Sequence, residues 1–114
     1  MSELRQWDVV WVRIRPEDRD VHPAVILSCE EFCQDMRRQT INVLYGTSKR
    51  PASVADAYEV TLSGADGLER PTLFNCGHLY TIDRRKITAQ IGRVSTERRR
   101  QIGRKIVATY RLPL

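Results

Sequence analysis

The sequence predicts a small, mainly β structure with short helices and one longer helix at the C-terminus. Segments rich in β-branched and aromatic residues recur at close spacing along most of the chain. Turn-forming pairs such as Asp66-Gly67 separate these segments. Near the end, Ile102, Ile106 and Tyr110 recur every four residues, as on one face of a helix. Such strands favour a curved antiparallel sheet or barrel, because closure of a sheet removes its unpaired edges.

The composition is that of one folded domain. A chain of 114 residues supports a single core, so we expect one domain over residues 1–114. Hydrophobic residues make up 41% and charged residues 29%, which argues against general disorder. No apolar run approaches the roughly 18 residues of a membrane span, and the polar start MSELRQWD lacks the core of a signal peptide. We therefore expect a cytoplasmic protein whose three cysteines remain thiols.

The positive charge is concentrated at the C-terminal end. The chain has a net charge of +5. Residues 1–83 contain 9 basic and 13 acidic side chains, whereas residues 84–114 contain 10 basic and 1 acidic. A concentrated positive field attracts polyanions such as nucleic acid or an acidic protein segment. The alternative is a solvated, arginine-rich helix face that includes Arg98, Arg99 and Arg100.

The N-terminal part predicts two strands. Residues 7–15, WDVVWVRIR, alternate in a strand pattern that places Trp7 and Trp11 on one face. Residues 16–22 are charged and begin with proline, so they predict a loop. Residues 23–28, PAVILS, predict a short buried strand.

The middle of the chain predicts two more strands and a short helix. Residues 29–39 suit one or two helical turns with Phe32 and Met36 on one side. A strand over 40–46 ends at a glycine, and the polar residues 47–56 predict a loop. Residues 57–62 alternate again.

The last third predicts further strands and the helix. The apolar run over 72–83 is interrupted at Gly77, which suits a bulge or a break between two strands. Residues 85–95 suit one more strand. Ser95 is a candidate helix N-cap, and Glu97 lies in the first turn, where the helix dipole favours an acid.

Five of these segments, in this order, resemble the PemK/MazF family of bacterial type II toxins. They are WDVVWV, HPAVILS, VLYGTSK, CGHLYTID and IGRVSTE, and the resemblance runs from Trp7 to the end. It implies an SH3-like β-barrel with small helices and a homodimer. It also implies a toxin that cleaves single-stranded RNA without a metal or cofactor and is blocked by an antitoxin with a flexible, often acidic segment.

The resemblance carries part of an active site onto this chain. Relatives commonly have an arginine before the proline of HPAVILS, where this chain has His22. A histidine transfers protons near neutral pH, although His22 also suits a loop position without chemistry. The family's Thr-Ser pair falls on Thr47 and Ser48, whose hydroxyls suit a phosphate, and Lys49 and Arg50 follow to attract it. The alternative is a polar turn.

The fourth segment departs from the family. Some relatives have Arg-Cys-Asp-Gln where this chain has Asn75, Cys76, Gly77 and His78. The arginine and aspartate have acid and base roles there, and both are absent here. One hypothesis is that His22 and His78 form a replacement acid–base pair, with Asn75, Arg84 and Arg85 contacting RNA.

Two other interpretations of this segment are weaker. Cys76 and His78 have the residue types of a thiol nucleophile and its base, but the family has a non-catalytic cysteine there. A zinc site requires Cys29, Cys33, Cys76 and His78 to converge, although the first two form a C-x3-C pair rather than the common C-x2-C. We therefore expect no metal.

Three functions remain open at this stage. The main hypothesis is an endoribonuclease toxin that acts on single-stranded RNA. The rival is a catalytically degenerate SH3-like module that binds nucleic acid or an acidic peptide, and the changes at Asn75 and Gly77 favour it. A weaker third is a toxin aimed at a protein such as a topoisomerase, as in some relatives by fold.

Overall fold

The computed structural model describes residues 3–17 and 19–113, which form seven strands and two α-helices. The strands are β1 (Asp8–Val12), β2 (His22–Ile26), β3 (Thr40–Thr47), β4 (Glu59–Leu62), β5 (Thr72–Asn75), β6 (Tyr80–Asp83) and β7 (Ile87–Arg93). The helices are α1 (Glu30–Gln34) and α2 (Thr96–Tyr110), with 3-10 turns at Ala52–Val54, Gly64–Asp66 and Arg84–Lys86. No helix among the described residues is long and apolar enough to cross a membrane.

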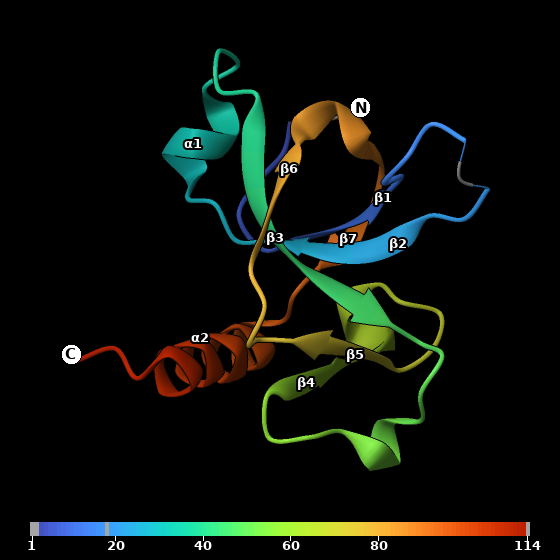
Figure 1. The fold of residues 1–114 in the computed structure, drawn as a ribbon, viewed down its shortest axis with the longest axis vertical. Coiled ribbons are helices and arrows are strands. Elements are labelled where there is room, and N and C mark those ends of the chain that lie inside the picture. The colour runs from blue at the N-terminus through green and yellow to red at the C-terminus, as the bar shows by residue number, and fades with distance from the viewer. Residues whose placement is uncertain (1–2, 18, 114) are drawn as a thin grey trace.

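The strands form one antiparallel sheet in the order β4-β5-β3-β2-β1-β7, and β6 pairs with β3 outside this path. Strand β3 connects two halves of the molecule (Figure 1). Its first part pairs with β6 and β2, whereas Gly46 and Thr47 pair with β5. A Cβ atom at residue 46 would lie 2.6 Å from the ring of Phe74. Glycine therefore leaves room for the Phe74 side chain where β3 pairs with β5.

The predicted mainly β fold with a C-terminal helix is confirmed, with one difference in the sheet. In the part of the chain that the structure describes, β4 and β7 are the two ends of the pairing order and do not pair with each other. The expected barrel is therefore a strongly curved sheet that hydrogen bonds do not close. The interruption at Gly77 is a break between β5 and β6 rather than a bulge.

Two expectations about side-chain packing were wrong. Trp7 lies outside β1 with φ of 74°, so it does not share a strand face with Trp11. Helix α1 ends at Gln34, so Met36 lies outside it and does not share a helix side with Phe32; both side chains are exposed, Phe32 by 37% and Met36 by 72%. The guanidinium of Arg38 instead lies over the Phe32 ring, 3.6 Å from its centre.

The sheet separates two hydrophobic cores. Val10 and Val12 of β1 pack in the first core with residues of β2, β3, β6 and β7. Val9 points to the other side and packs in the second core with Phe74 and Ile102. Helix α2 covers this second core (Figure 1). Because β1 is buried on both faces, it reads as a nearly continuous apolar run.

Asp66 connects the loop before β5 to the start of α2. It is buried, and its carboxylate accepts hydrogen bonds from the backbone N–H groups of Ser63 at 3.0 Å and Ser95 at 2.8 Å. Gly67 follows in a left-handed conformation with φ of 93°. This loop packs directly on β7, where a Cβ at Gly92 would overlap the Asp66 carbonyl oxygen and lie 2.8 Å from the Gly67 Cα.

We predict that Gly92→Ala lowers the free energy of unfolding by about 1–3 kcal/mol, because the added methyl must displace packed backbone. Urea unfolding followed by circular dichroism measures this change. Gly103→Ala is the matched control, because nothing lies within 4 Å of a Cβ at that position in α2. It should raise stability by about 0.5–1 kcal/mol. An unchanged stability for Gly92→Ala would contradict the close packing of β7 on this loop.

Candidate functional site

A pocket of about 350 Å³ lies between the start of β2 and the end of β3. Its lining comes from β1, the β1–β2 loop and the start of β2, from the end of β3 and the residues after it, and from the segment that leads into β5. The apolar and small lining residues are Trp11, Val21, Pro23, Gly46, Leu68 and Thr72. The polar and charged lining residues are Asp20, His22, Thr47, Ser48, Lys49, Glu69 and Arg70.

The strand register explains why His22, Thr47 and Ser48 meet. Ala24 of β2 pairs with Tyr45 of β3 in an antiparallel register. Extension of this register by two residues places His22 opposite Thr47. The Thr47 hydroxyl oxygen accepts a hydrogen bond from the backbone N–H of Lys49 at 3.2 Å, which turns the chain at the end of β3. Three of the four residues predicted as catalytic therefore share one pocket.

Lys49 and Arg70 supply positive charge to this pocket. Within the described residues, neither side chain makes a hydrogen bond or an ion pair, and both residues are exposed. Asp20 and Glu69 supply carboxylates to the same pocket. The imidazole of His22 is half-buried and likewise makes no side-chain hydrogen bond within residues 3–17 and 19–113. The pocket thus combines two cationic side chains with two carboxylates, the hydroxyls of Thr47 and Ser48, and an imidazole.

Arg50 was predicted to bind RNA beside Lys49, but its guanidinium is occupied elsewhere. It donates hydrogen bonds to both carboxylate oxygens of Glu59, at 3.0 and 2.9 Å, and to the carbonyl oxygen of Val54 at 3.1 Å. Glu59 is only 6% exposed. A buried carboxylate needs such a partner, so the structural role of Arg50 competes with RNA binding.

Arg84 and Arg85 lie at the opposite end of β3 from the pocket, because Asp83 pairs with Thr40. The guanidinium of Arg84 donates to four backbone carbonyl oxygens around the end of α1, at residues 32, 33, 35 and 38. Arg85 forms an ion pair with Asp83 at 2.8 Å. Hydrogen bonds from Arg85 lower the pKa of Asp83 to about 2. Neither arginine reaches the pocket.

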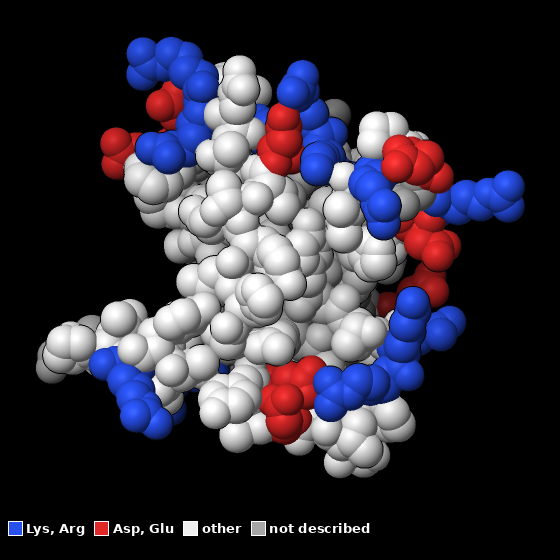
Figure 2. All heavy atoms as spheres, viewed as in Figure 1, with Lys and Arg blue, Asp and Glu red and all other residues white. Residues whose placement is uncertain are grey.

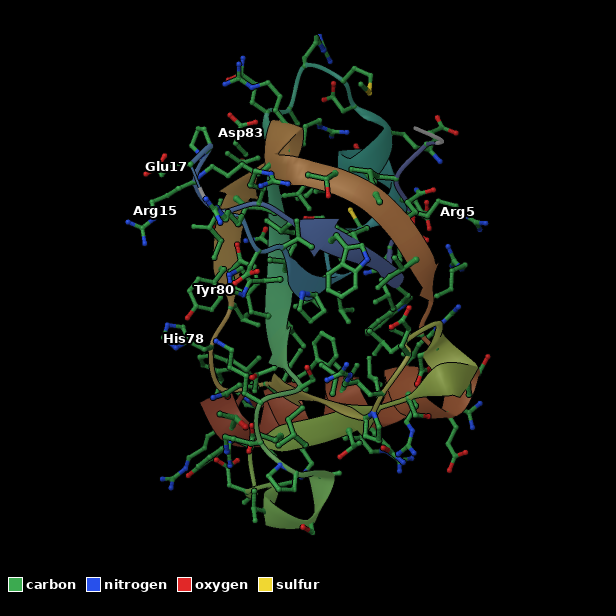
Figure 3. All side chains as sticks on the ribbon, turned by 90° about the vertical axis from the view of Figure 1, so that its right-hand side faces the viewer. Arg5, Arg15, Glu17, His78, Tyr80 and Asp83 are labelled. Carbon is green, nitrogen blue, oxygen red and sulfur yellow. The ribbon has the colours of Figure 1, made fainter. Side chains whose placement is uncertain are left out.

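The segment from Asn75 to His78 does not line the pocket. The side-chain oxygen of Asn75 accepts a hydrogen bond from the Gly77 N–H at 2.8 Å, which fixes the turn after β5. His78 is exposed, and its ring stacks on Tyr80 with 4.5 Å between centres and 10° between planes. Figure 3 shows both side chains at the surface. His22 lines the pocket and His78 does not, so the two imidazoles are not brought together there.

The cysteines give no support to thiol or zinc chemistry. Cys33 packs in the first core and Cys76 in the second, while Cys29 is exposed. Burial raises the pKa of both buried thiols to about 11. Within the described ranges, no group of three or more histidine, cysteine, aspartate or glutamate side chains is arranged to hold a metal ion.

Asp20, Glu69, Arg70 and Trp11 also line the pocket, and the sequence did not indicate them. Asp20 is two residues from His22 in the predicted loop, which is a weak local signal. Glu69 and Arg70 follow the Asp66-Gly67 turn, and only the packing of that turn on β7 brings them to the pocket. No pattern in the sequence predicts the contact between this turn and β7.

Residues 5–109 match the family model described as "PemK-like, MazF-like toxin of type II toxin-antitoxin system". The chain belongs to this family. The match covers nearly the whole sequence and agrees with the five segments that carried the resemblance. A comparison with the sequences of curated proteins gives no match.

Solved structures share the fold at low sequence identity. The toxin MazF-mt6 of Mycobacterium tuberculosis has a TM-score of 0.76 and 19% identity, over 94% of this chain and 99% of that chain. A chain of the MazE–MazF structure from Deinococcus radiodurans has a TM-score of 0.78 and 16% identity, over 99% and 100%. An endoribonuclease in complex with its cognate antitoxin, from a mycobacterial species, has a TM-score of 0.75 and 13% identity. The similarity covers 100% of this chain and 99% of that chain.

We predict that iodoacetamide modifies Cys29 much faster than Cys76 in the folded protein at pH 8. Cys29 is exposed, whereas a thiol pKa of about 11 leaves Cys76 roughly one part in a thousand ionised. Mass spectrometry of timed samples measures the sites. Cys29→Ser should remove the fast reaction, and urea should expose all three thiols. Equal rates at Cys29 and Cys76 in the folded protein would contradict this assignment.

Proposed function

We propose that this toxin is a metal-independent endoribonuclease that cleaves single-stranded RNA. The observation that supports the proposal most strongly is the pocket that gathers His22, Thr47 and Ser48 beside the cations of Lys49 and Arg70. Membership of the toxin family and the similarity to a structure named as an endoribonuclease add support. The proposal extends to Thr47 and Ser48 as phosphate-binding residues and to His22 as a proton-transfer residue.

The reaction places clear demands on the pocket. A base takes the proton of the 2′-hydroxyl, the resulting oxygen attacks phosphorus, and an acid protonates the departing 5′-oxygen. The products are a 2′,3′-cyclic phosphate and a 5′-hydroxyl. His22 supplies one of the two proton-transfer groups in this proposal. The carboxylates of Asp20 and Glu69 are the pocket groups available for the other.

The partners follow from the same proposal. We propose that the toxin acts in the cytoplasm as a homodimer and is blocked by a cognate antitoxin with a flexible acidic segment. Similarity to two structures described as toxin–antitoxin complexes supports such a partner. The cations of Lys49 and Arg70 pair with no carboxylate in residues 3–17 and 19–113 and suit an acidic segment as well as RNA, so one pocket serves both substrate and inhibitor.

A second candidate function is an RNA-binding module without catalysis. Asn75 and Gly77 stand where some relatives have an arginine and an aspartate, and the Asn75 side chain is engaged with the Gly77 N–H. His78 does not line the pocket. These observations favour a pocket that binds an RNA phosphate but does not cleave the bond between phosphorus and the 5′-oxygen.

We predict that the purified protein cleaves mixed-sequence single-stranded RNA in EDTA and leaves 2′,3′-cyclic phosphate or 3′-phosphate ends. His22→Ala should lower the rate roughly 10²- to 10⁴-fold, because proton transfer is lost. Thr47→Val should lower it roughly 10²- to 10³-fold, because the hydroxyl donor to the phosphate is lost. Product ends are identified by mass spectrometry.

Thr40→Val is the matched control for the threonine variant, because Thr40 is exposed at the other end of β3. Its rate should equal that of the unaltered protein. Intact RNA that binds in a salt-sensitive manner would instead establish the binding module. Cleavage that persists in both pocket variants would reject this pocket as the active site.

We predict that Lys49→Gln and Arg70→Gln each weaken binding of an uncleavable 2′-O-methyl RNA. Each should reduce the slope of log affinity against log salt by about 0.7, the value for one lost phosphate contact on a single strand. Arg37→Gln is the control, because Arg37 is exposed next to the far end of β3 and pairs with Asp35. Fluorescence anisotropy across a salt series measures the slopes. Equal slopes for all three variants would place the RNA backbone elsewhere.

A further inference from the structure

Three aromatic rings form a continuous step on the surface beside the pocket. The rings of Tyr45 and Tyr80 meet edge to face with 4.7 Å between their centres. The ring of His78 then stacks on Tyr80, nearly parallel, at 4.5 Å. Tyr45 is half-buried, whereas Tyr80, which is 38% exposed, and His78 are both exposed. We refer to Tyr45, Tyr80 and His78 as the aromatic step.

The aromatic step begins next to the phosphate pocket. Tyr45 and Thr47 are two residues apart on β3, so their side chains leave the same face of the strand about 7 Å apart. Tyr80 is held beside Tyr45 because β6 pairs with β3 through Tyr80 and Val43. A ligand that lodges its phosphate at Thr47 therefore has flat aromatic surface within reach.

The face that carries the outer end of the step is uncharged. Figure 2 shows lysine, arginine, aspartate and glutamate around the rim of this face and none at its centre. Figure 3 is turned by 90° from the view of Figures 1 and 2, and His78 and Tyr80 lie at its left edge. They are therefore on the side of the molecule that faces the viewer in Figures 1 and 2. In the described residues, the His78 side chain makes no hydrogen bond or ion pair, and one face of its ring is covered by Tyr80. The other ring face remains available.

We propose that the aromatic step stacks an unpaired nucleobase next to the phosphate that occupies the pocket. This inference rests on the proposed action on RNA. A nucleotide has an anionic phosphate and a flat, neutral base, which match the cationic pocket and the uncharged step, respectively. Aromatic side chains bind single-stranded nucleic acid in this way because every base presents a π-face. His78 is then a base-binding residue outside the proton-transfer machinery.

The experiment uses uncleavable 2′-O-methyl oligoribonucleotides of mixed sequence with a 2-aminopurine base at a single position. Stacking on an aromatic ring quenches this fluorescent base. His78→Ala removes the outer ring, and His78→Phe keeps a flat ring but has no nitrogen for proton transfer. We expect His78→Ala to weaken binding about 5- to 150-fold and to abolish the quenching. His78→Phe should retain both, and the salt slope should stay unchanged in each variant.

Several outcomes would overturn the proposal. His78→Ala with full affinity and full quenching would show that no base stacks there. His78→Phe that fails like His78→Ala would show that the imidazole nitrogens matter rather than the ring. Sedimentation of each variant tests the rival occupant, a second copy of this chain. A dimer that His78→Ala dissociates, with quenching unaffected in the monomer, would assign the step to dimer contact.

The two proposals fail in different ways. Cleavage of RNA by the unaltered protein without any quenching would leave the endoribonuclease and reject the aromatic step. Quenched binding of the uncleavable RNA without cleavage of ordinary RNA would support the step and reject catalysis. His78→Phe that still cleaves ordinary RNA at the normal rate would also support a base-binding rather than a proton-transfer role for His78.

Discussion

The pairing of β3 with β5 at Gly46 is the constraint on which the rest of the structure depends. The hydrogen at this position leaves room for the Phe74 ring, which a Cβ atom would approach to 2.6 Å. Phe74 is fully buried in the second core, beneath α2. The same pairing extends to Thr47, the last residue of β3, which lies opposite the start of β2. The residue at position 46 therefore links the packing of the second core to the placement of Thr47, whose hydroxyl we propose to bind phosphate.

Contacts with buried carboxylates leave only some of the lysine and arginine side chains available to bind a ligand. Glu59 engages Arg50, and Asp8 engages Arg93 at 2.9 Å, because a carboxylate shielded from water needs charged or N–H partners. Backbone carbonyls around α1 engage Arg84 in the same manner. The cations of the pocket, Lys49 and Arg70, come from residues 1–83, which carry a net negative charge. The arginine-rich C-terminal segment thus dominates the overall charge of the protein without lining the candidate site.

Local patterns in the sequence predicted the elements well and their spatial relations poorly. The four-residue spacing of Ile102 and Ile106 predicted α2, and Gly77 marked the break between two strands, because both signals arise within a few neighbouring residues. The location of Arg84 depends on which end of β3 pairs with Asp83, and no local pattern specifies that register. Arg70 joins the pocket through the packing of its loop on β7, which is equally invisible in the sequence. The resemblance to a family supplied His22, Thr47 and Ser48 as candidates, which composition and periodicity did not.

The substitution of histidine for the family's usual arginine changes what the pocket must provide. A guanidinium stays charged across the working range of proteins and offers fixed donors, whereas an imidazole gains or loses its proton near neutral pH. In the proposed mechanism His22 acts with a second proton-transfer group from the pocket, because Asn75 and Gly77 stand where some relatives carry an arginine and an aspartate. Asp20 and Glu69 lie in this pocket, and the segment after β5 is occupied by the turn at Asn75 and the aromatic step. We propose that proton transfer in this chain uses groups inside the pocket, and that the segment between β5 and β6, which does not line the pocket, holds the base instead.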